Sequence, residues 1–111
     1  MTDAVQERVL LVEDDDSLRQ LLVEELEDRG LQVRALASAE EAVGSLESWE
    51  PALVVSDLRL PGADGMALLR RVKSMQAAPA FLVITAFGSI QQAVAALKEG
   101  ADEFLTKPLD L

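Results

Sequence analysis

The fold of this chain is decided by a short apolar run that ends in a carboxylate, Leu53-Val54-Val55-Ser56-Asp57. Three further runs have a similar design, since each contains consecutive apolar residues and leads into polar residues. They are residues 9–12 before Glu13-Asp14-Asp15-Asp16, residues 81–84 before Thr85, and residues 103–106 before Lys107-Pro108. Short apolar runs between helical patterns are typical of parallel strands that are covered on both faces. Because ligands bind beyond the carboxyl ends of such strands, we expect these polar residues to meet in one crevice.

Helical patterns alternate with the strands and predict an α/β fold with a parallel sheet. Leucines at helical spacing follow the first run, with Asp16 or Ser17 expected as the N-cap and Gly30 just past the end. A weaker strand is expected over residues 31–36. Capping-box spacing begins two later helices, at residues 38–41 and 89–92. The inner face of the last helix, which ends at Gly100, is expected to consist of Ile90, Ala93, Val94 and Leu97.

Composition limits the function. The chain has 111 residues, enough for one domain, and its formal net charge is −10. Such a charge disfavours direct binding to nucleic acid or to anionic lipid, which both need clustered positive charge. Cysteine and histidine are absent, which excludes thiol chemistry, phosphohistidine chemistry and histidine ligation of a metal. We expect a cytoplasmic location, because the sequence shows neither a signal-peptide pattern nor an apolar run of membrane-spanning length.

The strand-end residues suit phosphoryl chemistry. Asp57 can act as a nucleophile towards phosphorus and form an acyl phosphate. Glu13 and Asp14 would repel both Asp57 and a phosphoryl group unless a divalent cation is bound, and Mg²⁺ prefers such oxygen ligands. Lys107 supplies an ammonium group and Thr85 a hydroxyl group to the phosphoryl oxygens.

Each of these residues also has a simpler explanation. Asp57 could be a turn former, Thr85 an ordinary strand residue and Lys107 a solvated surface lysine. Asp15 and Asp16 are better explained as helix-start residues that complement the helix dipole. The joint occurrence of complementary groups at four strand ends favours the functional interpretation.

The same residues resemble a known family. The matching segments are 10–19 with Glu13-Asp14-Asp15-Asp16, 56–65 with Ser56-Asp57, Val83-Ile84-Thr85-Ala86, and Lys107-Pro108. Together they resemble the receiver domain of bacterial two-component response regulators, a non-enzyme signalling domain that assists its own phosphorylation and dephosphorylation. The resemblance covers residues 8–111, with residues 1–7 as an N-terminal tail. It implies a flavodoxin-like, doubly wound five-stranded sheet of order 2-1-3-4-5, one of the common orders of doubly wound sheets.

The resemblance also implies roles for single residues. Asp57 would take a phosphoryl group from the phosphohistidine of a sensor histidine kinase. Glu13, Asp14, Asp57 and the backbone carbonyl of Arg59 would bind Mg²⁺, and Thr85 and Lys107 would contact the phosphoryl group. Members commonly have a cis bond before the proline that matches Pro108. Thr85 and Phe104 would act as the switch, although Phe104 lacks the more frequent tyrosine hydroxyl and could be a plain core residue.

The resemblance is greatest to receivers of the nitrogen-regulator type, which precede domains that control transcription. A downstream effector domain and a possible homodimer are therefore expected partners. The family's fifth helix would start near Leu109, so we expect that helix to be absent from this chain.

Three other interpretations are open. An Asp-nucleophile acyl-phosphate hydrolase would need an Asp-x-Asp pattern and a cap domain, and a flavin carrier would need a phosphate loop rich in Ser, Thr and Gly. A receiver fold that acts as an interaction module without phosphorylation is the third, and the complete set Glu13, Asp14, Asp57, Thr85 and Lys107 argues against it.

Overall fold

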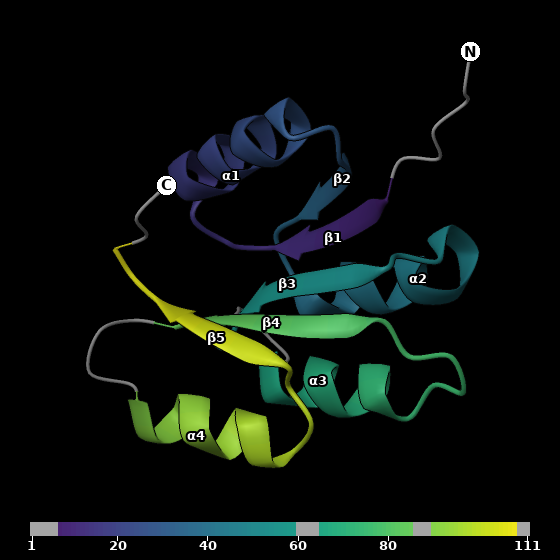
Figure 1. Cartoon of the computed structure of the whole chain (residues 1–111), viewed down its shortest axis with the longest axis vertical. Coiled ribbons are helices and arrows are strands. Elements are labelled where there is room, and N and C mark those ends of the chain that lie inside the picture. Colours follow the sequence, from purple (N-terminus) through teal and green to yellow (C-terminus); the bar gives the residue numbers. More distant parts are fainter. Residues whose placement is uncertain (1–6, 60–64, 86–89, 109–111) are drawn as a thin grey trace.

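Five parallel strands alternate with four helices in the part of the chain that the structure describes, residues 7–59, 65–85 and 90–108 of a computed structural model (Figure 1). In chain order the elements are β1 (Arg8–Val12), α1 (Asp16–Asp28), β2 (Gln32–Leu36), α2 (Ala39–Trp49), β3 (Leu53–Asp57), α3 (Gly65–Lys73), β4 (Ala80–Thr85), α4 (Ile90–Lys98) and β5 (Glu103–Thr106). The strands pair in the order β2-β1-β3-β4-β5. The predicted flavodoxin-like α/β fold is confirmed.

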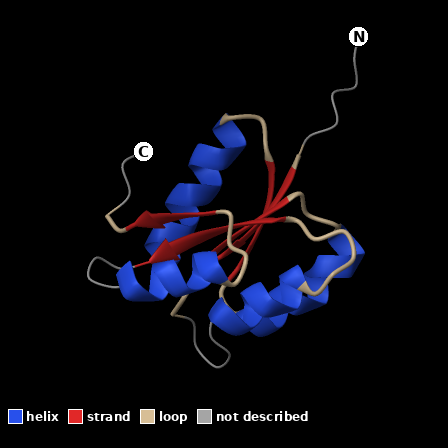
Figure 2. Ribbon diagram, turned by 60° about the horizontal axis from the view of Figure 1, so that its bottom comes forward, coloured by secondary structure: helices blue, strands red, loops and turns tan. Residues whose placement is uncertain are grey.

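Helices cover both faces of the sheet, and this explains why the strand sequences are continuously apolar (Figure 2). Successive strand residues point to opposite faces. Leu10, Val12 and Val54 therefore belong to the larger core cluster, together with buried residues of α2, α3 and α4. Val9 and Leu11 belong to a second cluster with Leu22 of α1. None of the described helices is long and apolar enough to cross a membrane.

The start of α1 differs from the prediction by one residue or more. Asp15, not Asp16 or Ser17, is the N-cap, and its carboxylate accepts a hydrogen bond from the Leu18 amide at 3.0 Å. The sequence offers three consecutive aspartates with the same capping chemistry, so the choice is made by the fold. The Glu13 amide still donates to the Leu36 carbonyl of β2 at 3.0 Å, and the helix then begins three residues later.

The other helix ends largely follow their predicted signals. Ser38 caps α2 by accepting from the Glu41 amide. Gly30 and Gly100 have positive φ angles of 84° and 112°, as expected for glycines just past a helix end. The second predicted capping box begins at residue 89, which lies outside the described residues. Residues 109–111, where the family's fifth helix would start, also lie outside them.

The predicted inner face of α4 is wrong for three of its four residues. Ala93 is buried as expected, but Ile90, Val94 and Leu97 are 36–47% exposed, and Ala96 is the second buried residue. Residues three apart lie on one helical face, so the two alanines form the stripe that meets the sheet. Their small side chains let the helix approach the sheet closely, and the larger aliphatic side chains lie outside the contact.

Candidate functional site

Polar residues from three strand ends and the segment after β5 meet at the carboxyl edge of the sheet. Glu13 follows β1, Asp57 ends β3 and Thr85 ends β4, and all three are buried. Lys107 directly follows β5, and its amide donates to the Thr85 carbonyl at 2.8 Å. The parallel register therefore brings these predicted site residues to one edge, as the strand-end pattern indicates.

Lys107 lies between two of the carboxylates. Its Nζ donates to Asp57 Oδ2 at 2.6 Å and lies 3.0 Å from Glu13 Oε1. Burial disfavours the ammonium, but the hydrogen bond to Asp57 and the contact with Glu13 outweigh it and raise the pKa of Lys107. The lysine stays charged and partly compensates the two buried acids.

Glu13 is the least satisfied group of the edge. Burial raises the pKa of Glu13 and the nearby Asp57 charge adds to this, while the Asp15 amide, at 3.0 Å from Oε2, and Lys107 act in the opposite direction. Although Lys107 Nζ is within 3.0 Å of Oε1, no described donor makes an aligned hydrogen bond to that oxygen. Oε1 therefore has a cationic neighbour but no aligned donor, and a metal ion can serve as a partner for such an oxygen.

The acidic residues could hold a metal ion. Glu13, Asp14 and Asp57 each offer a carboxylate oxygen, and these oxygens all lie within 4.8 Å of one another. Asp14 is exposed, which opens the cluster to solvent. A set made of oxygen atoms alone suits a hard cation such as Mg²⁺, and the unsatisfied Glu13 oxygen fits the same ligand.

Arg59 and Phe104 complete the predicted set. The Arg59 amide donates to Asp57 Oδ1 at 2.9 Å, which fixes the second carboxylate oxygen of Asp57 and places Arg59 beside the cluster. Phe104 is partly buried and packs against the core cluster that contains α2, α3 and α4. This packing agrees with a core role as well as with a switch role, so the switch role stays a prediction. The Lys107–Pro108 bond is cis, as expected.

Two further residues support the site although they are not among the predicted site residues. Gly65 begins α3 directly against Asp57, where an added Cβ would collide with the Asp57 carbonyl oxygen and lie 2.6 Å from Leu58 Cα. Arg19 of α1 donates to the Glu13 carbonyl at 2.8 Å. The sequence carried only weak signals for them, a glycine at a helix start and an arginine one turn into a helix.

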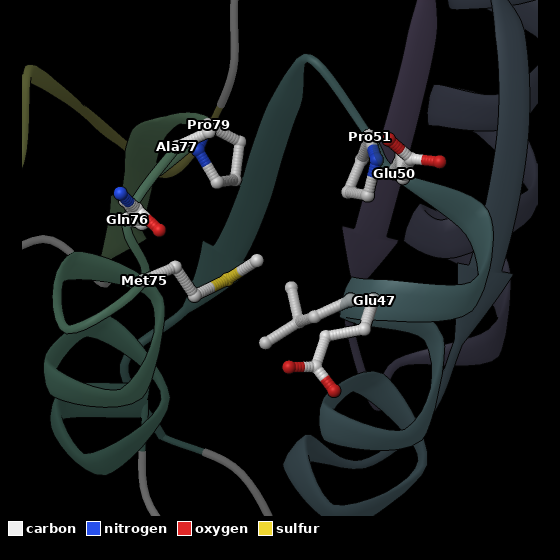
Figure 3. A pocket seen from close by; sticks show the side chains of 8 residues that line it. Glu47, Glu50, Pro51, Met75, Gln76, Ala77 and Pro79 are labelled. Atoms are coloured by element: carbon white, nitrogen blue, oxygen red, sulfur yellow. The ribbon is translucent and has the colours of Figure 1, made fainter.

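A pocket of about 390 Å³ lies at the opposite, amino-terminal edge of the sheet (Figure 3). The C-terminal part of α2 with Pro51 forms one wall, and the segment after α3 forms the other, with the Met75 side chain pointing into the gap. None of the predicted site residues lines this pocket. The candidate site is therefore a charged edge of the sheet and is separate from the pocket.

Comparisons with known proteins agree with this architecture. A family model described as the response regulator receiver domain matches residues 9–111. The C4-dicarboxylate transport transcriptional regulatory protein DctD from Pseudomonas aeruginosa is 42% identical over 104 residues, which cover 93% of this chain and 22% of that protein. The DNA-binding transcriptional regulator NtrC from Salmonella typhimurium is 35% identical over 103 residues, again 93% of this chain and 22% of that protein.

Solved structures give the same result. The receiver domain of NtrX from Brucella abortus is similar with a TM-score of 0.87 and 33% identity, over 92% of this chain and 87% of that chain. The chain spans about a fifth of the length of the two curated relatives. From the match over residues 9–111, the chain belongs to the response regulator receiver domain family, the signalling domains of two-component systems.

Proposed function

We propose that Asp57 is the phosphoacceptor of this receiver domain and takes its phosphoryl group from the phosphohistidine of a sensor histidine kinase. The observation that carries the proposal is the environment of the Asp57 carboxylate. Asp57 Oδ2 accepts a hydrogen bond from Lys107 at 2.6 Å, and Asp57 Oδ1 accepts one from the Arg59 amide at 2.9 Å. The same carboxylate belongs to the acidic cluster with Glu13 and Asp14. A carboxylate that is buried and held by two donors is fixed in orientation for attack.

The reaction transfers a phosphoryl group from the phosphohistidine of the kinase to the Asp57 carboxylate. An Asp57 oxygen forms a bond to phosphorus as the bond between phosphorus and the donor's imidazole nitrogen breaks, and the imidazole keeps the bonding electrons and takes up a proton. Bound Mg²⁺, with Glu13, Asp14, Asp57 and the Arg59 carbonyl as ligands, would neutralise charge on the phosphoryl oxygens. Lys107 would turn its ammonium from Asp57 to a phosphoryl oxygen, and Thr85 would donate its hydroxyl to another.

The signal then passes to the rest of a longer protein. We place the receiver domain at residues 8–111 with residues 1–7 as a tail, in a cytoplasmic regulator of the nitrogen-regulator type that controls transcription through a downstream effector domain. The matched relatives DctD and NtrC, both transcriptional regulators, support this assignment. Thr85 and Phe104 would carry the switch to the surface, and a homodimer is one form the output could take.

Phosphorylation by a small donor tests the proposal. The protein is incubated with acetyl phosphate and MgCl₂, and intact mass spectrometry measures the fraction that gains one phosphoryl group. We expect a gain for the wild type and for Asp28→Ala, whose exposed aspartate lies at the end of α1, and none for Asp57→Ala or with EDTA. If the folded wild type gains nothing, the domain works as an interaction module without phosphorylation and the proposal fails.

A further inference from the structure

The segment between β1 and α1 carries two of the proposed metal ligands, Glu13 and Asp14, and it is held in place by the helix that follows it. We propose that Arg19 is a positioning residue for the metal site. This inference rests on the proposed function, since it concerns the same cluster. In the described structure the Arg19 side chain makes no hydrogen bond or ion pair with the carboxylates of Asp14 and Asp57, so it would act on these ligands through the backbone of the segment.

The guanidinium of Arg19 joins two points of this segment. Nη1 donates to the Glu13 carbonyl at 2.8 Å and Nη2 contacts the Asp16 carboxylate at 2.6 Å. The Arg19 side chain is 24% exposed although it comes from the first turns of a surface helix. A planar guanidinium with two bound acceptors holds both in a fixed relation, which an ammonium group does not achieve.

The direction of the Glu13 carbonyl determines the path of the backbone to Asp14. The Glu13 amide is fixed by its hydrogen bond to Leu36 of β2. Its carbonyl belongs to the planar peptide that leads to Asp14, so the direction of this carbonyl sets where the Asp14 backbone goes. With β2 on the amide side and Arg19 on the carbonyl side, the chain leaves β1 in one direction, and Asp14 is brought to the cluster.

Asp15 closes the same network. Its amide donates to Glu13 Oε2 at 3.0 Å, its carboxylate caps α1 at the Leu18 amide, and its carbonyl accepts from the Arg19 amide at 2.9 Å. These contacts all lie within residues 13–19, and the sheet bond of Glu13 ties the segment to β2. Groups that orient metal ligands from outside the coordination sphere change metal affinity about 10-fold to 100-fold when they are removed.

Two possible actions of Arg19, through its charge and through the position of the ligands, predict opposite changes in Mg²⁺ affinity when Arg19 is replaced. If the arginine acted only by its charge, its removal would strengthen Mg²⁺ binding, because a nearby cation repels Mg²⁺. If it positions the ligands, its removal weakens binding. We expect the second effect to prevail, because salt weakens the effect of a single charge on the metal site, whereas loss of the guanidinium removes the hydrogen bond that holds the Glu13 carbonyl.

The experiment is a titration of the protein with MgCl₂ alone, followed by the amide NMR shift of Arg59, which reports on Asp57. We expect Arg19→Gln to raise the dissociation constant about tenfold. Arg19→Lys keeps the charge but lacks the planar pair of donors, so we expect a rise there too. The matched control is Arg29→Gln, which removes the same charge from the end of the same helix, at a residue that is 64% exposed and 3.8 Å from Glu25.

The outcomes separate the two proposals. Absence of Mg²⁺ binding by the wild type would defeat the metal site of the proposed function itself. Wild-type affinity in Arg19→Gln, tighter binding there, or full rescue by Arg19→Lys would overturn the positioning role while the proposed function stands. Thermal unfolding followed by circular dichroism shows whether each variant is folded, and if neither Arg19 variant folds, Arg19 is a structural residue and the inference is wrong.

Discussion

The two edges of the sheet handle acidic side chains in opposite ways. At the carboxyl edge, the buried Glu13 and Asp57 share the ammonium of Lys107, and the exposed Asp14 lies in the same cluster. Near the amino ends of β4 and β5, Glu99 and Asp102 each have a cation of their own. Arg70 binds Glu99 through two donors at 2.8 and 2.9 Å, and Lys73 lies 3.0 Å from Asp102.

The pKa shifts run in opposite directions at the two edges. Burial raises the pKa of Glu13, whereas hydrogen bonds lower the pKa of Glu99, through Arg70, and of Asp102, through the Phe81 amide and then Lys73. The paired acids near α3 and α4 contribute to the stability of the fold. The buried Glu13 carboxylate is disfavoured in the metal-free protein, and an acid with a shifted pKa beside other charged groups is typical of a binding site.

The largest effect is expected from adding a side chain at Gly65, which lies against the backbone of Asp57. Gly65→Ala would place a methyl group against the Asp57 carbonyl and Leu58 Cα, which are backbone atoms that cannot rotate away. We expect a loss of about 3 kcal/mol in the free energy of unfolding, measured by urea denaturation. The control is Gly44→Ala in α2, where an added Cβ meets nothing within 4 Å. That variant should gain about 0.5–1 kcal/mol from helix propensity. Equal stability of the two variants would show that the backbone at Asp57 and Leu58 shifts at little cost to make room for the methyl group.

Mg²⁺ should raise the free energy of unfolding through the acids of the carboxyl edge and independently of those at the amino edge. At about 100 times its dissociation constant, a ligand of the folded state adds about 2.7 kcal/mol to the free energy of unfolding. We expect this increment in the wild type and in Asp102→Asn, and we expect Asp57→Asn to lose most of it. Urea denaturation with and without MgCl₂ measures it. A similar increment in Asp57→Asn would mean that the ion binds elsewhere.

The alternation of strands and helices and the meeting of the site residues could be predicted from local sequence, whereas the sheet order was implied by the family resemblance. An apolar run that ends in a polar residue marks the carboxyl end of a strand, and parallel pairing brings these ends to one edge of the sheet. The N-cap of α1 could not be chosen among equivalent aspartates, because the sheet bond of Glu13 decides it. The predicted inner face of α4 is wrong at its large aliphatic residues because the small side chains of Ala93 and Ala96 meet the sheet.

The supporting contacts of the site were beyond the sequence for a different reason. Gly65 matters because of backbone atoms at the end of another strand, and the Arg19 contact depends on a side chain that reaches back along its own helix. The ion pairs of Arg70 and Lys73 join residues 29 positions apart. Such contacts are set by tertiary structure, and no local periodicity indicates them.

The two edges should also titrate in different pH ranges. The folded state binds the Glu13 proton more tightly than the unfolded state does, so the metal-free protein gains stability as the pH falls through the raised pKa of Glu13 towards its ordinary value of 4.5. Glu99 and Asp102 have lowered pKa values, so their contribution is lost only below their ordinary values of 4.5 and 3.8. The fluorescence of Trp49, the single tryptophan, follows urea unfolding at each pH.

Glu13→Gln isolates the group responsible. We expect this variant to lose the gain in stability that the wild type shows between the raised pKa of Glu13 and its ordinary value of 4.5, since the amide of Gln does not titrate. With saturating Mg²⁺ the wild type should show the reverse slope, because protonation of Glu13 competes with the metal. A metal-free wild type that loses stability throughout this range would contradict the raised pKa.

The smallest effect is expected at the amino edge, from the pair Lys73 and Asp102. The Asp102 side chain is 55% exposed, so solvent and salt screen its attraction to Lys73, and we expect a coupling energy of about 0.5 kcal/mol. A double-mutant cycle with Lys73→Met and Asp102→Asn measures this energy, and the coupling should fall further in about 1 M NaCl. Asp102→Asn alone should cost more than the coupling, because the Phe81 amide at 2.8 Å then loses its charged acceptor. A coupling that is several times larger and insensitive to salt would show that this edge, too, holds its charges in a buried environment, and the contrast between the two edges would no longer hold.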